Sequence, residues 1–275
     1  CTKSLTLKFE IKSASKLMNK IIKYVFGQFY WHQQSDQLTY KGSWKKNCFH
    51  GKGQLKYSNG TLFKGHFKNG SKTGFGELVS PNGYNYQGDW IGGKKTGCAK
   101  IIYKNGDTYN GQVVDGLRQG LGELQIAASG WKFKGTWTKE QISGAVEITT
   151  SDWTFKGTMT KIDAPMTGKM LYADKSTYVG ELLNFQRNGQ GTLTLNSGEC
   201  ISGVWNDNVN VQDATRTDSS GVYWEGSLRN LKPQGIMHIR LPNGQEYDGV
   251  WDSGDMLRVL SVHNREREPM PYIVH

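Results

Sequence analysis

A glycine that returns about every 23 residues constrains this chain more than any other feature of its sequence. From position 40 onward one pattern recurs: aromatic, any residue, glycine, any residue, bulky apolar residue. Such a period predicts an array of small structural units rather than one globular core. We call these glycines the key glycines and number repeats 1 to 10 from them: Gly42, Gly65, Gly88, Gly111, Gly135, Gly157, Gly180, Gly203, Gly226 and Gly249.

Each repeat has the period-2 alternation of a β-hairpin. Residues two apart share one face of a strand, so the aromatic residue, the key glycine and the bulky residue lie together, whereas Lys41 and Ser43 take the other face. A second alternating segment, Gly-x-Gly-x-Leu-x-Tyr at 51–57, is followed by Asn59-Gly60, a pair typical of type I′ hairpin turns. Each repeat is therefore expected to be strand, short polar turn, strand, tight turn.

The hairpins are expected to stack into one sheet. A lone hairpin is marginal in water, but hairpins in series cover one another's edges and share an apolar surface. A glycine, lacking a side chain, leaves room for a neighbouring ring. We predict an all-β fold: an elongated, single-layer antiparallel sheet of about ten stacked hairpins over residues 40–262, solenoid-like in its repetition.

The two ends of the chain lack the glycine period. Residues 1–39 are predicted to hold a strand at 5–11 and then a basic amphipathic helix whose charged face carries Lys16, Lys20 and Lys23. This segment could cap the open edge of the first hairpin, dock on a partner, or lie on a membrane surface. Residues 263–275 are predicted to form an extended tail.

The repeat resembles a known family. Tyr-x-Gly-x-Trp, a polar turn and then His50-Gly51-x-Gly53 are similar to the MORN repeat (membrane occupation and recognition nexus). Repeats 1 to 4 and 7 match best, whereas repeats 5 and 6 carry Val146 and Met166 in place of glycines. The resemblance implies a concave, aromatic-lined sheet face that binds helices or extended peptides, in non-catalytic cytoskeletal, ciliary or membrane-contact scaffolds that are often dimers.

The resemblance places a partner-binding groove along the repeated rings. Its expected members are Tyr40, Trp44, Phe63, Phe67, Tyr86, Trp90, Tyr109, Phe133, Trp137, Tyr178, Trp205, Trp224, Tyr247 and Trp251.

Positive charge is concentrated in the first half of the chain. Residues 1–134 hold 21 Lys/Arg against 7 Asp/Glu, and residues 135–275 hold 13 against 17. This excess is compatible with a solvated face, with docking on an acidic protein, or with an anionic lipid surface. Nucleic acid is not favoured, because the aromatic residues belong to the packed face of the repeat. The expected basic surface is Lys16, Lys20, Lys23, Lys45, Lys46, Lys64, Lys68, Lys94 and Lys95.

Repeat 8 departs from the pattern in its second strand. Gln212, Ala214, Arg216 and Asp218 stand where other repeats have glycine, glycine and apolar residues. Two charged groups are therefore expected to point into the groove. Two interpretations remain open: a partly frayed hairpin, or a polar contact with a partner or the tail.

No arrangement of residues indicates catalysis. The histidines form no i, i+4 pair, the cysteines have no paired C-x-x-C spacing, and no phosphate-binding glycine loop occurs. No apolar run approaches the roughly 20 residues of a membrane span. We expect no enzyme activity, cofactor or metal. The expected function is a scaffold in a larger intracellular assembly, cytoplasmic and ciliary or cytoskeletal, with a peripheral membrane tether that binds anionic phospholipid through the basic half as the alternative.

Overall fold

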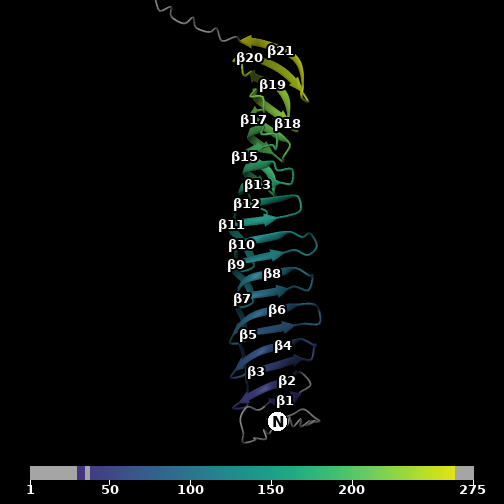
Figure 1. Cartoon of the computed structure of the whole chain (residues 1–275), viewed down its shortest axis with the longest axis vertical. Coiled ribbons are helices and arrows are strands. Elements are labelled where there is room, and N and C mark those ends of the chain that lie inside the picture. The colour runs from purple at the N-terminus through teal and green to yellow at the C-terminus, as the bar shows by residue number, and fades with distance from the viewer. Residues whose placement is uncertain (1–29, 35–37, 264–275) are drawn as a thin grey trace, which may run out of the picture. The chain divides into compact units, whose positions relative to one another are not determined.

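The computed structural model describes residues 30–34 and 38–263, and every regular element in this part of the chain is a β-strand (Figure 1). The predicted strand at 5–11, the predicted helix with its three lysines, and the tail after His263 lie outside the described residues. The strands are β1(Tyr30–Gln34), β2(Leu38–Lys45), β3(Cys48–Tyr57), β4(Leu62–Lys68), β5(Ser71–Val79), β6(Asn85–Ile91), β7(Lys94–Ile102), β8(Thr108–Val114), β9(Leu117–Gln125), β10(Lys132–Thr138), β11(Gln141–Thr149), β12(Trp153–Met159), β13(Met166–Tyr172), β14(Thr177–Leu183), β15(Gln186–Thr194), β16(Cys200–Asn206), β17(Asn210–Thr217), β18(Tyr223–Arg229), β19(Lys232–Arg240), β20(Glu246–Asp252) and β21(Asp255–His263).

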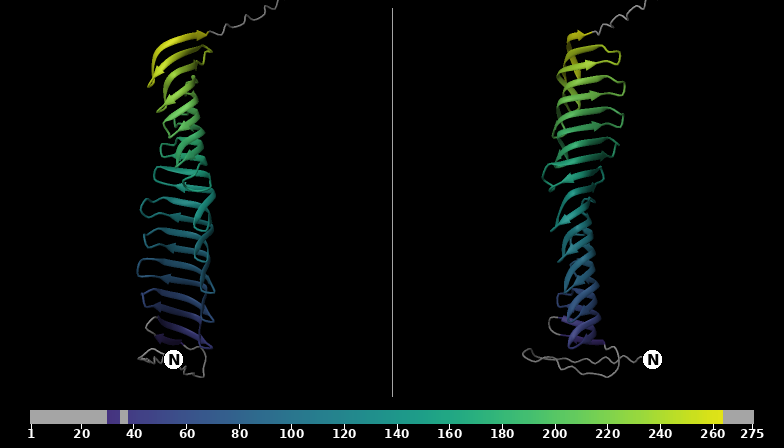
Figure 2. Two further views of the ribbon diagram at one scale, coloured as in Figure 1. Left: turned by 180° about the vertical axis from the view of Figure 1, so that it is seen from behind. Right: turned by 90° about the vertical axis from the view of Figure 1, so that its left-hand side faces the viewer.

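The strands belong to two compact units, which divide after Gln141. In the first unit, each strand from β1 to β9 pairs antiparallel with the next strand along the chain, up to β10. In the second, β11 to β21 pair in the same way. Figure 2 shows, within each unit, one open and twisted layer whose strands follow chain order. The predicted all-β sheet of stacked antiparallel hairpins is confirmed.

A strand that was not predicted covers the first edge. β1 pairs with β2 from Tyr30↔Ser43 to Gln34↔Thr39. The edge of repeat 1 is therefore hydrogen-bonded to residues just upstream of it, as an exposed edge strand requires.

The tight turns lie at a different place from the one predicted. The left-handed backbone pair of a type I′ turn occurs between the two strands of a repeat, for example at Lys46 (φ 48) and Asn47 (φ 65). At Asn59-Gly60 only the glycine has positive φ, and Tyr57 N donates to Thr61 O over 2.8 Å. Asn-Gly therefore closes a three-residue loop with its left-handed residue at the end, and the type I′ expectation for it was wrong.

The Gly-x-Gly pair combines two different requirements. In repeat 2, strand pairing jumps from Gly65↔Gly76 to His66↔Thr73, so Gly74 belongs to a bulge and adopts φ +60, a conformation that favours glycine. Gly76 is extended, but a Cβ there would lie 2.6 Å from the Phe63 ring carbons. One glycine supplies backbone freedom and the other supplies space.

The core is a row of rings lying on glycine backbone. Tyr40 and Phe63 are fully buried. A tyrosine at this position also satisfies its hydroxyl locally, because Tyr40 Oη donates to Ser43 O (2.9 Å) and Tyr86 Oη donates to Asp89 O (2.8 Å). Tyr109 and Tyr178 do the same, with Gln112 O and Glu181 O as acceptors. The repeated ring is thus held both by packing and by a hydrogen bond to its own strand.

Repeat 8 keeps its second strand. β17 pairs with β16 and β18 around a bulge near Asp213 (φ 48), so the hairpin is not frayed. Arg216 Nε lies 2.7 Å from Glu199 Oε1 within the sheet. Asp218 accepts hydrogen bonds from Ser220 N and Val222 N of its own turn. The two charged groups have partners inside the repeat array, which neither sequence interpretation anticipated.

The close approach of ring and glycine can be tested at Gly76. We expect Gly76→Ala to lower the free energy of unfolding by about 1–3 kcal/mol, because the new methyl group overlaps the Phe63 ring. In a Phe63→Leu background the same change should cost measurably less, since the shorter side chain leaves space. Urea denaturation of the four proteins in this cycle measures both values. Equal costs in the two backgrounds would show that the ring does not impose the glycine.

Candidate protein-binding face

Most rings of the predicted groove are core rather than open surface. Ten of them are buried: Tyr40, Phe63, Phe67, Tyr86, Trp90, Tyr109, Phe133, Trp137, Tyr178 and Trp205. The other four, Trp44, Trp224, Tyr247 and Trp251, are half-buried. A partner cannot reach the buried ten without opening the sheet. The accessible part of this face must be built from residues that cover them.

The residue seven positions after the key glycine forms this cover. In repeat 1 it is Phe49, which stacks on Tyr40 with 4.0 Å between ring centroids. In repeats 2, 3, 4 and 7 it is a cation that lies over aromatic rings of its own repeat, of the following repeat, or of both. We call Lys72, Lys95, Arg118 and Arg187 the stacked cations.

The two stacked lysines share one indole ring. Lys72 Nζ lies 4.7 Å and Lys95 Nζ lies 5.9 Å from the Trp90 ring centroid. Lys72 also lies over Phe63, at 5.0 Å, and Lys95 donates a 2.7 Å hydrogen bond to Tyr84 Oη. Contacts of an ammonium with an aromatic face contribute about 0.5–2 kcal/mol each. These contacts hold both lysines against the ring row.

The two stacked arginines have a further, polar partner. Arg118 lies 4.3 Å from the Trp137 ring centroid and forms an ion pair with Glu140, Nε to Oε2, of 2.8 Å. Arg187 lies 4.5 Å from the Trp205 ring centroid, and its Nε donates to Asn208 Oδ1 over 3.1 Å. Each guanidinium is therefore both stacked and hydrogen-bonded.

The predicted basic surface needs one correction. Lys95 was expected to point outward, but the structure places it half-buried over rings, because its long stem follows the aromatic face. Lys45, Lys46, Lys64, Lys68 and Lys94 are exposed. Of these, Lys94 pairs with Asp115 across 2.8 Å. Lys16, Lys20 and Lys23 lie outside the described residues.

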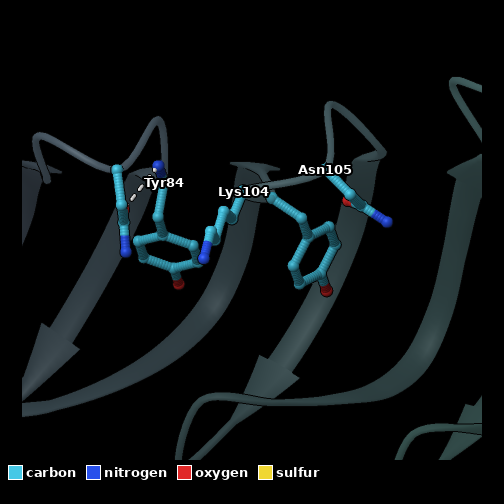
Figure 3. Close-up of a pocket in the computed structure, with 5 residues that line it drawn as sticks. Tyr84, Lys104 and Asn105 are labelled. Atoms are coloured by element: carbon cyan, nitrogen blue, oxygen red, sulfur yellow. Dashed lines mark hydrogen bonds between the residues drawn. The ribbon is translucent and has the colours of Figure 1, made fainter.

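A shallow hollow continues the face beside Lys95. It has a volume of about 470 Å³ and is lined by Asn82, Tyr84, Tyr103, Lys104 and Asn105. The two tyrosine rings meet edge to face, with 6.3 Å between their centroids. Figure 3 shows Lys104 reaching towards Tyr84 while Asn105 points away from both. The hollow offers aromatic edges and a further ammonium group next to the stacked lysines.

Burial changes the proton affinities of these groups. It raises the pKa of Tyr84 to about 12, with smaller contributions from Tyr103 and Glu140. It lowers the pKa of Lys95, and the positive charge of Lys72 lowers it further. Below this lowered pKa the Lys95 side chain is charged, and the full cost of burying that charge reduces the stability of the folded protein. This cost disappears as the pH rises through the lowered pKa, because the side chain loses its charge. The raised pKa keeps the Tyr84 hydroxyl neutral at neutral pH.

Sequence reasoning missed this outer layer, although a signal existed. Lys72, Lys95 and Arg118 stand at the same place in consecutive repeats, exactly one period apart. A cation at a fixed position of a ring-bearing repeat indicates stacking rather than a solvated face. Tyr84 precedes its key glycine by four residues and, likewise, belongs to no position that the repeat pattern singled out.

The coupling of the two lysines can be measured by titration. We expect Lys72→Gln to raise the pKa of Lys95, because it removes the nearby positive charge while leaving the burial. Lys94→Gln, next in sequence but exposed, is the matched control and should leave that pKa unchanged. Side-chain NMR of the lysine ammonium groups follows the titration. Equal effects of the two substitutions would contradict the proximity of Lys72 and Lys95.

Features of other functional classes were sought in the same part of the chain. Across residues 30–34 and 38–263 no three His, Cys, Asp or Glu side chains are grouped as metal ligands. Those residues also contain no helix with the length and apolar character of a membrane span.

Some solved structures are weakly similar to this chain. The G-box domain of the microcephaly protein CPAP is 14% identical, covers 70% of this chain and 100% of its own, and gives a TM-score of 0.44. The TCP domain of Drosophila melanogaster SAS-4, solved with a proline-rich motif of Ana2, is 14% identical, covers 65% and 84%, and gives a TM-score of 0.28. Likeness at this level carries no functional conclusion. No curated protein sequence matches the chain significantly.

The family model of the MORN repeat matches five segments, residues 40–62, 63–83, 86–108, 109–128 and 178–200. These are repeats 1 to 4 and 7, which keep the ring and the Gly-x-Gly pair except that Ala99 replaces the second glycine in repeat 3. Repeats 6, 8, 9 and 10 show the same antiparallel pairing of their two strands with altered glycines. The chain is a MORN-repeat protein.

Proposed function

We propose that this chain is a non-catalytic scaffold that binds other proteins through the outer layer of its aromatic face, as part of a larger intracellular assembly of the cytoskeletal or ciliary kind. The observation that carries the proposal is the separation of the face into two layers. Buried rings stabilise the sheet, and half-buried tyrosines and stacked cations remain accessible above them.

The composition of the outer layer supports protein binding. Tyr84, Tyr103 and Arg118 are of the residue types that are enriched in protein interfaces, where a rigid ring or guanidinium loses little conformational entropy on binding. A row of such groups repeated once per hairpin suits an extended peptide or a helix laid along the sheet. Family membership adds support, because the MORN repeat is a non-catalytic repeat.

A membrane tether is the second candidate, and it uses a different surface. Lys45, Lys64 and Lys68 are exposed at positions that alternate with the ring face. Anionic lipid would attract these lysines by long-range electrostatics, which salt screens over about 8 Å at physiological ionic strength. The two candidates therefore predict sensitivity to substitutions on opposite faces of the sheet in the first unit.

The experiment compares one variant for each face in the full chain. Tyr84→Ser with Tyr103→Ser changes the ring face, and Lys45→Gln with Lys64→Gln and Lys68→Gln changes the lysine face. Circular dichroism and thermal unfolding establish that both variants keep the sheet. We expect proteins captured stoichiometrically from native extract, and identified by cross-linking to this face, to be lost with the tyrosine variant only.

Sedimentation with phosphatidylcholine/phosphatidylserine vesicles is run beside the capture, at about 0.05 and 0.2 M salt. Salt-sensitive sedimentation that the lysine variant abolishes, together with capture that the tyrosine variant leaves intact or with no protein partner, would replace the scaffold by the membrane tether.

A further inference from the structure

The four stacked cations differ in what the following repeat offers them. Each stacked cation is contacted by a type I′ turn of the following repeat. The second residue of that turn stands five positions after the key glycine of the following repeat. Its N–H donates a hydrogen bond to the main-chain carbonyl oxygen of the cation residue. Glu140 N donates to Arg118 O over 3.1 Å, and Asn208 N donates to Arg187 O over 3.1 Å. The side chains of these turn residues then supply oxygen atoms to the cation.

Those oxygen atoms bind both the side chain and the main chain of the arginine. Glu140 Oε1 accepts from Arg118 N over 2.6 Å, and its Oε2 accepts from Arg118 Nε over 2.8 Å. Asn208 Oδ1 accepts from Arg187 N over 2.7 Å and from Arg187 Nε over 3.1 Å. At these two cations the following turn carries a built-in acceptor.

The lysines face the same turn without an acceptor. Gly93 N donates to Lys72 O and Gly116 N donates to Lys95 O, each over 3.0 Å, so these glycines are the structural equivalents of Glu140. A Cβ at Gly93 would meet no atom within 4 Å, and one at Gly116 would meet only Lys95 Cδ, at 3.8 Å. The place that an acidic or amide side chain fills at the arginines is open here.

No carboxylate in the described part of the chain forms an ion pair with Lys72 or Lys95. Glu140, which lies close enough to Tyr84 to affect its pKa, is already paired with Arg118. Two half-buried ammonium groups beside one indole therefore have no carboxylate partner among residues 30–34 and 38–263. Leaving such charges unpaired is costly, and an added carboxylate offsets the cost.

We propose that Lys72 and Lys95 bind carboxylate side chains of an extended acidic segment of a partner protein, which take the place that the side-chain oxygens of Glu140 and Asn208 take at Arg118 and Arg187. This inference rests on the proposed scaffold function and names the chemistry of its partner. Two observations support the proposal: charge complementarity, and the unoccupied space beside Gly93 and Gly116.

The spacing of the repeats fits an extended segment. Successive repeats are two strands apart, or on the order of 9.6 Å at about 4.8 Å per strand. A polyproline II segment rises about 3.1 Å per residue, so side chains three residues apart recur at about 9.3 Å on one side. Acidic residues at every third position can therefore meet Lys72 and Lys95 in consecutive repeats. Lipid headgroups are not favoured, because both lysines are held against rings rather than extended into solvent.

The test uses fluorescein-labelled peptides with glutamate or glutamine at every third position and proline between. We expect the glutamate peptide to bind the full chain and the glutamine peptide not to bind, by fluorescence anisotropy. Lys72→Gln with Lys95→Gln should weaken binding at least about tenfold, as the loss of two charge-assisted contacts implies. Lys64→Gln with Lys68→Gln, an equal charge change in the same unit, should alter it less than about twofold.

A second pair of variants supplies the acceptor internally. Gly116→Glu copies Glu140 in the turn after Lys95, and Gly116→Gln is its uncharged control. Both substitutions place a side chain at φ 85, close to the φ 74 that Glu140 adopts. We expect Gly116→Glu to weaken binding of the glutamate peptide and Gly116→Gln to leave it nearly unchanged. Equal losses in the two variants would attribute the effect to backbone strain and overturn the inference.

The remaining outcomes also decide the matter. Equal binding of the two peptides, or equal losses from the two lysine pairs, overturns the inference. So does displacement of the glutamate peptide by millimolar inorganic phosphate, or phosphatidylserine vesicle binding that depends on Lys72 and Lys95. The capture experiment separates the two proposals. If the Tyr84/Tyr103 variant loses a captured protein that the Lys72/Lys95 variant retains, the scaffold function is supported and only the acidic partner is refuted.

Discussion

The contact between a repeated aromatic ring and the glycine backbone beneath it is the interaction on which the rest of the structure depends. The ring needs a strand surface with little or no side chain, so in repeats 1 to 4 and 7 glycine stands at the key position and glycine or alanine stands opposite it. The tyrosine hydroxyl then returns to a main-chain carbonyl of its own strand, which lets a polar atom be buried without cost to hydrogen bonding. A single layer of sheet acquires a core in this way, although no second layer covers it within residues 30–34 and 38–263.

The burial of the rings determines which surface a partner can reach. Because the rings are buried within the face of the sheet, a partner meets the residues that cover them, which stand seven positions after the key glycine. A cation is well suited to this position, since its stem packs on a ring while its charge stays accessible. The chemistry of the accessible face is therefore decided by the residue at this position.

The turn of the following repeat then decides whether each stacked cation is satisfied. Glu140 and Asn208 provide oxygen atoms within the chain, whereas Gly93 and Gly116 do not, on nearly identical backbone. One residue in a type I′ turn thus separates a closed structural contact from one that can accept a partner. Repetition makes the comparison direct, because equivalent positions in different repeats serve as controls for one another.

The repeat period, the assignment of faces and the hairpin architecture could be predicted from the sequence, because each depends on local spacing: a strand alternates every two residues and a hairpin needs turn residues between its strands. The turn type at Asn59-Gly60 could not be predicted from the sequence, because the Asn-Gly dipeptide is compatible with more than one kind of hairpin loop. Pairing of β1, burial of Lys95 and the ion pair of Arg216 with Glu199 depend on which strands become neighbours. Sequence by itself determined that this chain forms stacked hairpins with one ring-bearing face. Only the tertiary structure decided that the rings are core and that Lys72 and Lys95 lie over them with no carboxylate partner in the part of the chain that the structure describes, because burial and pairing arise between residues that the sequence keeps a full repeat apart.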